Sequence, residues 1–398
     1  MADLPPSALP LSDLTVIDIT VARAGPTAVR QLADWGADVV RIEPPPGRGG
    51  GDPGESHTSA DYLNLHRNKR SLALDLKTAE GRAVLHRLVG KADVLVENMR
   101  TPVKHRLGFD WETLHAINPR LVLGSVSGFG QSGPYAERGG VDQIAQGLGG
   151  MMSITGIPGQ GPVRAGVAIS DVTAGLQLAV GILVALHERQ HTGTGRWVHT
   201  SLLESMIGML DFQAARWTVN HVVPPQAGND HPTNLPMGMY ATSDGYLNIA
   251  APWPHLWLKF CEAIGRGDLS ADPRFDSARN RATNKAELNT ELAAALVKRT
   301  TAAWVEVLNA VDVPAGPVND IEQTFADPQV RHLGVAAPID HPVAGPIEIV
   351  RNATNIEGVP NHIRRPSPGP GEHSDEVLAG FGFSRDEIAD LRVANIVA

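Results

Sequence analysis

The regular alternation of short apolar runs with helix-spaced segments most constrains how this chain folds. TVIDIT (15–20) has the pattern of a strand, AVRQLADWGA (28–37) has helical spacing, and DVVRIEPP (38–45) returns to a strand pattern. The alternation continues between residues 70 and 130 as RSLALDL, TAEGRAVLHRLVGKA, DVLVEN and LVLGSVSGFG. Apolar runs separated by helices are typical of a parallel sheet that is covered on both faces. We therefore predict the α/β class, with a large domain built on a parallel sheet.

The chain of 398 residues is long enough for a second domain. The sequence pattern changes after the polar, turn-rich segment GNDHPTNLP (228–236), and short strands and helices are predicted beyond it. We predict a smaller α+β domain at 228–330, between an N-terminal part at 1–227 and a C-terminal segment at 331–398.

Charge and cysteine content argue against several classes of partner. The net charge is −9, and acidic and basic residues are interspersed, so no basic stripe for a nucleic acid is evident. The one cysteine, Cys261, is consistent with a reducing compartment, and residues 1–13 lack the pattern of a secretory leader. The longest apolar stretch, 176–186, is shorter than the roughly 20 residues of a membrane span. We expect a cytoplasmic protein without a membrane partner, and a buried helix around this stretch.

One short motif raises the possibility of a metal site. HERQH (187–191) has the spacing in which two histidines bind zinc and the glutamate activates water. The sequence TGTG follows immediately and ends the predicted helix, which places His191 in its last turn or beyond it. Glu204, His199 and Asp211 are possible third ligands, but the prediction is no metal site. The first strand is followed by VARAGP rather than a glycine-rich dinucleotide turn, so no nicotinamide or flavin site is predicted either.

A more informative residue lies at the start of the same helix. In PVRAGVAISDVTAG (162–175), Asp171 follows an apolar, strand-like run and comes directly before the helix. A carboxylate at that position is commonly a helix N-cap. Its surroundings in the sequence favour a catalytic role instead.

Several long segments resemble one protein family in the same order. These segments are ARAGPTAVRQLADWGADVVRIEPP, NLHRNKRSLALDLKTAEGR, ADVLVENMR, RLGFDWETLHAINPRLVLGSVSGFGQSGPY, GVAISDVTAG, HTGTGRWVHTSLLESM, DVPAGPVND and PGEHSDEVL. Together they resemble the family III CoA-transferases, also called the CaiB/BaiF or formyl-CoA transferase group. The resemblance extends from about residue 10 to the C-terminus.

The resemblance implies a fold and a reaction. Both ends of the chain would build a Rossmann-like large domain, and two subunits would interlock as a homodimer. Asp171 would be the nucleophile that moves CoA from an acyl-CoA donor to a carboxylic acid, through aspartyl anhydride and aspartyl-CoA thioester intermediates. Coenzyme A would be a substrate, and no prosthetic group would be required.

The resemblance also implies binding residues. Gly238 is the candidate for backbone stabilisation of an oxyanion. The residues expected to contact CoA are Leu74, Leu76, Lys77, Asn98, Met99 and Arg106.

Two departures from the family bear on the substrate. Arg23 stands where formyl-CoA transferase has glutamine, and we expect it to pair with the second carboxylate of a dicarboxylic acyl group such as succinyl. Val141 stands where related racemases have a histidine base, which favours a transferase over the alternative of an acyl-CoA racemase or isomerase. A catalytically silent CoA-binding protein is a further alternative, but it would not need Asp171.

Overall fold

The computed structural model describes residues 9–47 and 56–398 and divides them into two compact units. The large unit contains the described residues up to 151, residues 165–219 and residues 331–398. The small unit contains residues 152–164 and 220–330. Of the segment in which we predict no leader, residues 1–8 lie outside the described residues.

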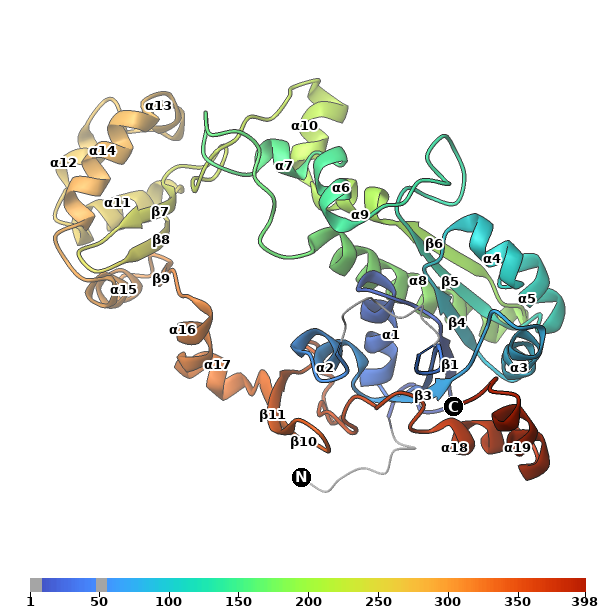
Figure 1. Ribbon diagram of the computed structural model, residues 1–398. Helices are drawn as coiled ribbons and strands as arrows, with labels where there is room; N and C mark the ends of the chain where they lie inside the picture. The colour runs from blue at the N-terminus through green and yellow to red at the C-terminus, as the bar shows by residue number, and fades with distance from the viewer. Residues whose placement is uncertain (1–8, 48–55) are drawn as a thin grey trace. The chain divides into compact units, whose positions relative to one another are not determined.

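A six-stranded parallel sheet forms the centre of the large unit, with the order β3-β2-β1-β4-β5-β6 (Figure 1). Its strands are β1 (Thr15–Asp18), β2 (Asp38–Glu43), β3 (Lys69–Ala73), β4 (Val94–Glu97), β5 (Val122–Ser127) and β6 (Trp197–Ser201). This order confirms the predicted α/β class and parallel sheet. The order reverses between β1 and β4, and ligands of such sheets bind outside the carboxyl ends of the strands at that point.

Helices cover both faces of this sheet. They are α1 (Ala24–Asp34), α2 (Ala60–His66), α3 (Ala79–Val89), α4 (Thr101–Leu107), α5 (Trp111–Ile117), α6 (Asp142–Leu148), α8 (Ile169–Thr192), α9 (Leu202–Met209), α18 (Ser374–Gly380) and α19 (Arg385–Val393). Helices α1 and α8 contribute the apolar core on one face, and α3, α5, α18 and α19 contribute the core on the other.

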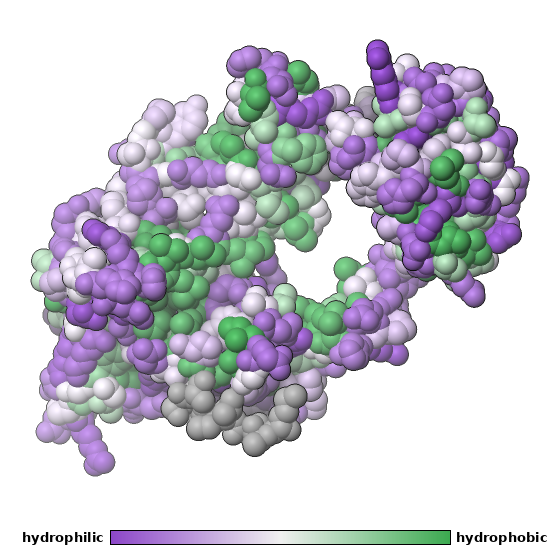
Figure 2. All heavy atoms as spheres, turned by 180° about the vertical axis from the view of Figure 1, so that it is seen from behind, coloured by the Kyte–Doolittle hydropathy of each residue, from purple (hydrophilic) through white to green (hydrophobic). Residues whose placement is uncertain are grey.

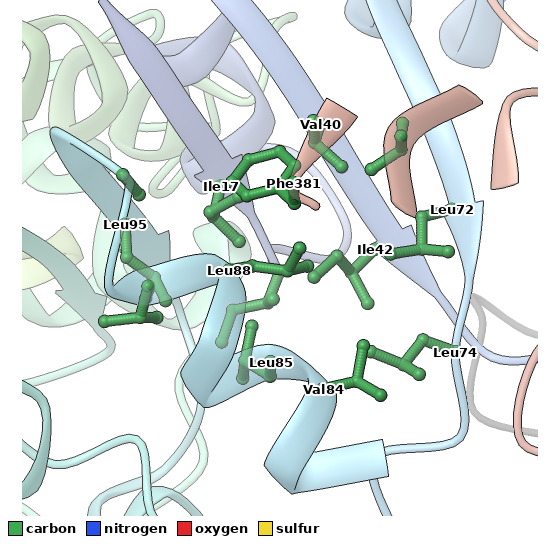
Figure 3. Packing of buried hydrophobic residues seen from close by; sticks show 14 of the residues in the cluster. Ile17, Val40, Ile42, Leu72, Leu74, Val84, Leu85, Leu88, Leu95 and Phe381 are labelled. Atoms are coloured by element: carbon green, nitrogen blue, oxygen red, sulfur yellow. The ribbon is translucent and has the colours of Figure 1, made fainter. Parts of the chain in front are cut away.

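Successive residues of the strands alternate between these two cores. Ile17, Val40 and Leu95 enter the core beneath α3, where they meet Leu85 and Leu88 (Figure 3). Their neighbours Val16, Val39 and Val94 enter the core beneath α1 and α8. Both faces are apolar, which explains the near-continuous hydrophobic runs in the sequence.

The C-terminal segment packs against the edge of the same sheet. The His373 amide donates to the Ser71 carbonyl at 3.0 Å, and the Ser374 hydroxyl donates to the Ala398 carbonyl at 2.6 Å. Val397 pairs with Leu74 just beyond β3. This segment ends in two helices, α18 and α19. Before them, β10 (Ala336–His341) and β11 (Gly345–Val350) form an antiparallel pair.

The small unit has its own sheet and its own core. Its antiparallel sheet contains β7 (Met237–Ala241), β8 (Tyr246–Ala250) and β9 (Ala315–Pro317). Its helices are α11 (Pro254–Ala263), α12 (Asp268–Ala271), α13 (Ala278–Thr283), α14 (Lys285–Leu296), α15 (Thr301–Asn309) and α16 (Ile321–Ala326). Trp257, Phe260 and Leu292 are among its buried residues. Three helices lie where the chain passes between units: α7 (Met151–Ile154), α10 (Phe212–Asn220) and α17 (Pro328–Leu333).

Helix α8 is longer than the apolar stretch that the sequence analysis identifies. It has 24 residues, and its most apolar window has a mean hydropathy of 1.8, so by length and composition it could cross a membrane. Half of that window is buried inside the protein. Core helices of soluble proteins have the same properties, so this helix alone is weak evidence for a membrane. The predicted buried helix is present but only partly buried, because Val180 and Val184 are more than half exposed.

Candidate active site

Asp171 lies in the first turn of α8, three residues after the N-cap residue Ala168. The sequence pattern predicts that Asp171 lies before the helix as a possible cap, and this prediction is wrong because the residue is inside the helix. The strand expected at 162–168 is also absent, and the segment has no regular structure. Among the described residues, no hydrogen bond to the Asp171 carboxylate is found. The side chain is therefore not used as a cap.

A carboxylate from a neighbouring helix caps α8 instead. Oδ1 of Asp142, the first residue of α6, accepts from the Ser170 amide at 2.9 Å and from the Ser170 hydroxyl at 2.8 Å. Asp142 is 8% exposed, and Ser170 is fully buried. This bond satisfies one of the free N–H groups of the first helical turn. It also fixes the residue directly before Asp171.

Gln146 holds the segment that leads into α8. It lies one turn after Asp142 on α6 and is fully buried. Its Oε1 accepts from the Ala165 amide at 2.8 Å, and its Nε2 donates to the Val167 carbonyl at 3.2 Å and to Asp142 Oδ2 at 2.7 Å. Every polar atom of this side chain is thus used to fix the approach to Asp171.

A close helix contact brings α1 to the start of α8. A Cβ atom on Gly175 would lie 2.6 Å from the Ala24 carbonyl oxygen and 2.7 Å from the Thr27 Cβ. Only glycine permits this approach, because one of the contacts is to backbone. The N-terminus of α1, which follows Arg23, is therefore held beside the first turns of α8.

Arg23 is positioned by a turn that is held from β4. Ala22 has a φ of 58°, in the left-handed region that costs a non-glycine residue about 1–2 kcal/mol. The side-chain amide of Asn98, just after β4, accepts from the Val21 amide at 2.9 Å and donates to the Val21 carbonyl at 2.7 Å. These two bonds fix the turn between β1 and α1. The Arg23 guanidinium also forms an ion pair with Asp61 of α2.

The pKa of the Asp171 carboxyl group is higher than that of an ordinary aspartate. Burial and, to a smaller extent, the nearby Asp142 carboxylate raise the pKa of its carboxyl to about 6, although Arg23 acts in the opposite direction. Partial burial disfavours the charged form, and a like charge adds to that effect. A carboxylate with this pKa is ionised at neutral pH and is more basic than an ordinary aspartate. These are suitable properties for a nucleophile.

The residues expected to contact CoA follow the carboxyl ends of β3 and β4, at the same edge of the sheet as Arg23. Lys77 and Arg106 are exposed, Leu76 and Met99 are half-buried, and the Asn98 amide is occupied by Val21. Leu74 is 1% exposed, and its side chain lies in the core shown in Figure 3. For Leu74, only backbone atoms could face a ligand.

Gly238 belongs to the small unit, where it lies inside β7 and pairs with Ile249. A Cβ atom here would lie 2.4 Å from Asp230 Oδ1, so a larger residue would require the Asp230 side chain to shift. Gly238 lines a pocket of about 590 Å³ together with residues 228–231, 248–250 and 314–316.

Val141 directly precedes Asp142 and is 62% exposed. It is the N-cap residue of α6 and has no side chain that could transfer a proton. The structure thus brings Asp171, Arg23 and the segment containing Val141 into one region of the large unit.

The HERQH motif lies at the other end of α8. His187 and His191 are both inside the helix, and their rings are 5.3 Å apart. Glu188 forms a two-bond ion pair with Arg196, at 2.7 and 2.9 Å. Within residues 9–47 and 56–398, no three His, Cys, Asp or Glu side chains are grouped closely enough to hold a metal ion. The motif therefore lacks a third ligand there.

Comparison with known proteins places this arrangement in one family. The family model for CoA-transferase family III matches residues 11–374, and the chain belongs to that family. It is 36% identical to the succinate–glutarate CoA-transferase of Agrobacterium fabrum, over 95% of this chain and 97% of the relative. It is 32% identical to the succinyl-CoA–D-citramalate CoA-transferase of Chloroflexus aurantiacus, over 98% of both chains.

A solved structure agrees with the fold. A CaiB/BaiF family protein from Brucella suis is 34% identical, with a TM-score of 0.83 over 94% of this chain and 99% of that one. The resemblance stated from the sequence is thereby confirmed, and the protein is a CoA-transferase.

The sequence analysis does not identify Ser170 and Gln146 as parts of the site. The signal for Gln146 is its spacing of four residues from Asp142, which places both side chains on one face of α6. The bond from Asp142 to Ser170 joins residues 28 positions apart, and no local pattern predicts it.

Proposed function

We propose that this protein transfers CoA from a dicarboxylic acyl-CoA, such as succinyl-CoA, to a carboxylic acid, with Asp171 as the nucleophile. The observation that carries the proposal is the partly buried carboxylate of Asp171, which has a pKa near 6, accepts no hydrogen bond within the described residues and lies near the cation of Arg23. The names of the similar proteins from Agrobacterium fabrum and Chloroflexus aurantiacus both include succinate or succinyl-CoA, which supports the choice of donor.

The first half-reaction loads CoA onto the enzyme. An Asp171 oxygen attacks the thioester carbonyl, a C–O bond forms, the C–S bond breaks, and CoA leaves as a thiolate. The thiolate then attacks the aspartyl carbonyl of the mixed anhydride. A new C–S bond forms, the bridging C–O bond breaks, and the donor acid leaves as a carboxylate.

The second half-reaction repeats these steps in reverse with the acceptor acid. Its carboxylate attacks the aspartyl-CoA carbonyl, which gives a second anhydride and CoA thiolate. The thiolate attacks the acceptor's acyl carbonyl, and the new acyl-CoA and the free Asp171 carboxylate are produced. Groups that donate hydrogen bonds to each oxyanion would lower these barriers, and Gly238 stays the candidate in the small unit.

Coenzyme A would bind along the carboxyl edge of the sheet. The segments that follow β3 and β4 lie at the edge where ligands of such sheets bind. Exposed Lys77 and Arg106 would meet phosphate groups as charged donors. Leu76, Met99 and the backbone at Leu74 would line the rest of the CoA path.

The role of Arg23 is tested by comparing two kinds of donor. Arg23 already pairs with Asp61, but that carboxylate is 62% exposed, so a substrate carboxylate can replace it at little cost. We expect Arg23→Ala to raise KM for succinyl-CoA about 10- to 100-fold, the value of a charge-assisted hydrogen bond, and to change acetyl-CoA kinetics little. Arg23→Lys, which keeps the cation, and Asp61→Asn, which removes its partner, are the controls. Equal losses with both donors would contradict this role.

We also propose that two copies of the chain form the interlocked homodimer that the family implies, in the cytoplasm. One face of α8 packs on the sheet and α1, but the opposite face exposes Leu176, Val180, Leu183 and Val184. Figure 2 shows hydrophobic side chains gathered on the surface of the large unit. A helix that is apolar on all sides is typically buried, which supports a partner on this face.

A further inference from the structure

Asp142 affects Asp171 in two ways, through the position of the preceding residue and through its negative charge. It fixes the residue before Asp171 through both hydrogen bonds from Ser170, at 2.9 and 2.8 Å. It also places a negative charge near a carboxylate that must lose its own charge when it is acylated. A residue that only capped the helix could be serine, threonine or asparagine, none of which is charged.

We propose that Asp142 is a positioning residue whose charge drives Asp171 towards its acylated state. This inference rests on the proposed function, because it concerns the anhydride and thioester formed on Asp171. In the free enzyme two carboxylates repel each other in a partly buried site. When Asp171 becomes an anhydride or a CoA thioester its charge leaves with the departing thiolate or acid, and the repulsion ends.

The surrounding hydrogen bonds hold the Asp142 carboxylate in place. The donors that reach it include the amide and hydroxyl of Ser170 and the Nε2 of Gln146 at 2.7 Å. No such donor to Asp171 is found within the described residues. Of the two carboxylates, Asp171 is therefore the one that is open to an acyl group.

The other charged groups near Asp171 do not replace this effect. Arg23, before α1, is the cation that acts on Asp171, and its influence opposes that of Asp142. Arg23 is itself paired with Asp61 of α2. From α9, which also packs on α8, Glu204 is bonded to the Ser201 hydroxyl at 2.7 Å.

The test separates charge from position with two variants. Asp142→Asn removes the charge and keeps a side-chain oxygen for Ser170, whereas Ser170→Ala removes one hydrogen bond and keeps the charge. A diazo reagent esterifies only protonated carboxyl groups, so the pH dependence of Asp171 labelling, followed by peptide mass spectrometry, gives its ionisation midpoint without any need for turnover. We expect the midpoint near pH 6 in the wild type and in Ser170→Ala. In Asp142→Asn it should fall by about one unit, a tenfold change in the equilibrium.

A second readout follows the intermediate itself. At a fixed ratio of succinyl-CoA to succinate, the fraction of Asp171 present as CoA thioester should fall several-fold in Asp142→Asn and stay near the wild-type value in Ser170→Ala. If Asp142→Asn folds poorly, Asp142→Ser, which keeps a side-chain oxygen that can accept from Ser170 and carries no charge, takes its place. Its midpoint should also lie below that of the wild type.

An unchanged midpoint in the Asp142 variants, or an equal shift in Ser170→Ala, would overturn the inference. The proposed function would still stand if wild-type Asp171 formed the thioester. If instead the midpoints shift as expected but no thioester forms in any variant, the proposed function fails and the part of this inference that concerns acylation fails with it.

Discussion

The raised pKa of Asp171 has a consequence for the stability of the fold as well as for activity. The pKa is about 6 in the folded protein and near 3.8 in an unfolded chain. Between these values the folded protein binds more protons than the unfolded chain. The free energy of unfolding therefore decreases as pH rises from about 4 to about 6 because of this one group. Above pH 6 this decrease in the free energy of unfolding is complete, and below pH 4 it is absent.

We therefore expect Asp171→Asn to abolish transfer and to stabilise the protein at neutral pH. Loss of a nucleophile should lower kcat by about 10³-fold or more. The unfolding free energy at pH 7.5 should rise by about 1–2 kcal/mol, less than the full pKa shift corresponds to because the group is partly solvated. Denaturant melts at pH 4 and pH 7.5 check this, and the gain should vanish at pH 4. A variant that is less stable than the wild type at both pH values would contradict a raised pKa of this carboxyl group.

At the scale of elements, the site depends on how closely α1 approaches α8. Gly175 makes that contact inside a helix, where glycine is by itself less favourable than alanine. Thr27, whose Cβ would be 2.7 Å from the new side-chain atom, is itself buried. The contact therefore cannot be relieved by a side chain that turns into solvent.

Substituting the glycine tests this contact. Gly175→Ala should lower the unfolding free energy by about 1–3 kcal/mol through overpacking and should also lower activity by displacing Arg23. Gly208→Ala in α9 is the matched control, because the nearest atom to its Cβ would be Gln177 Nε2 at 3.6 Å. In a helix with free space, alanine is better than glycine by about 0.5–1 kcal/mol, so this control should be neutral or stabilising. Equal effects of the two substitutions would show that the contact is unimportant.

The sequence is informative about elements whose burial creates a local pattern. Strands β1 to β5 could be predicted because both of their faces are buried, so each contains a short run of buried aliphatic residues. Residues 162–168 have a strand-like pattern because Val163 and Val167 alternate with other residues, but no neighbouring strand pairs with them. The capping of α8 by Asp142 could not be predicted, because the bond to Ser170 depends on how two helices pack rather than on spacing along the chain.

At the scale of the whole molecule, the exposed apolar face of α8 predicts the oligomeric state. A chain of 42.3 kDa should give twice that mass by light scattering, with no folded monomer on dilution, because interlocked subunits cannot separate without unfolding. Val180→Glu/Val184→Glu should lower the yield of dimer strongly. In a monomer both positions are more than half exposed, so the same change should cost less than about 0.5 kcal/mol.

A valine outside α8 serves as the control for the effect of an added glutamate. Val393 at the end of α19 is 83% exposed, and Val393→Glu should leave mass and melting temperature unchanged. A stable, active monomer of the wild type at micromolar concentration would contradict the dimer. So would wild-type behaviour of the double variant at α8.

The covalent intermediate on Asp171 is the central claim, and it can be measured directly. The wild-type protein is incubated with succinyl-CoA, reduced with borohydride and digested, and the peptide that contains Asp171 is examined by mass spectrometry, with Asp171→Asn as the control. We predict that the Asp171 side chain is recovered as the alcohol, as expected for a reduced aspartyl thioester, and that the corresponding peptide of the Asp171→Asn variant is unchanged. If the wild-type protein exchanges labelled succinate into succinyl-CoA while Asp171 is recovered unmodified, CoA does not pass through this carboxylate, and the proposed mechanism is wrong.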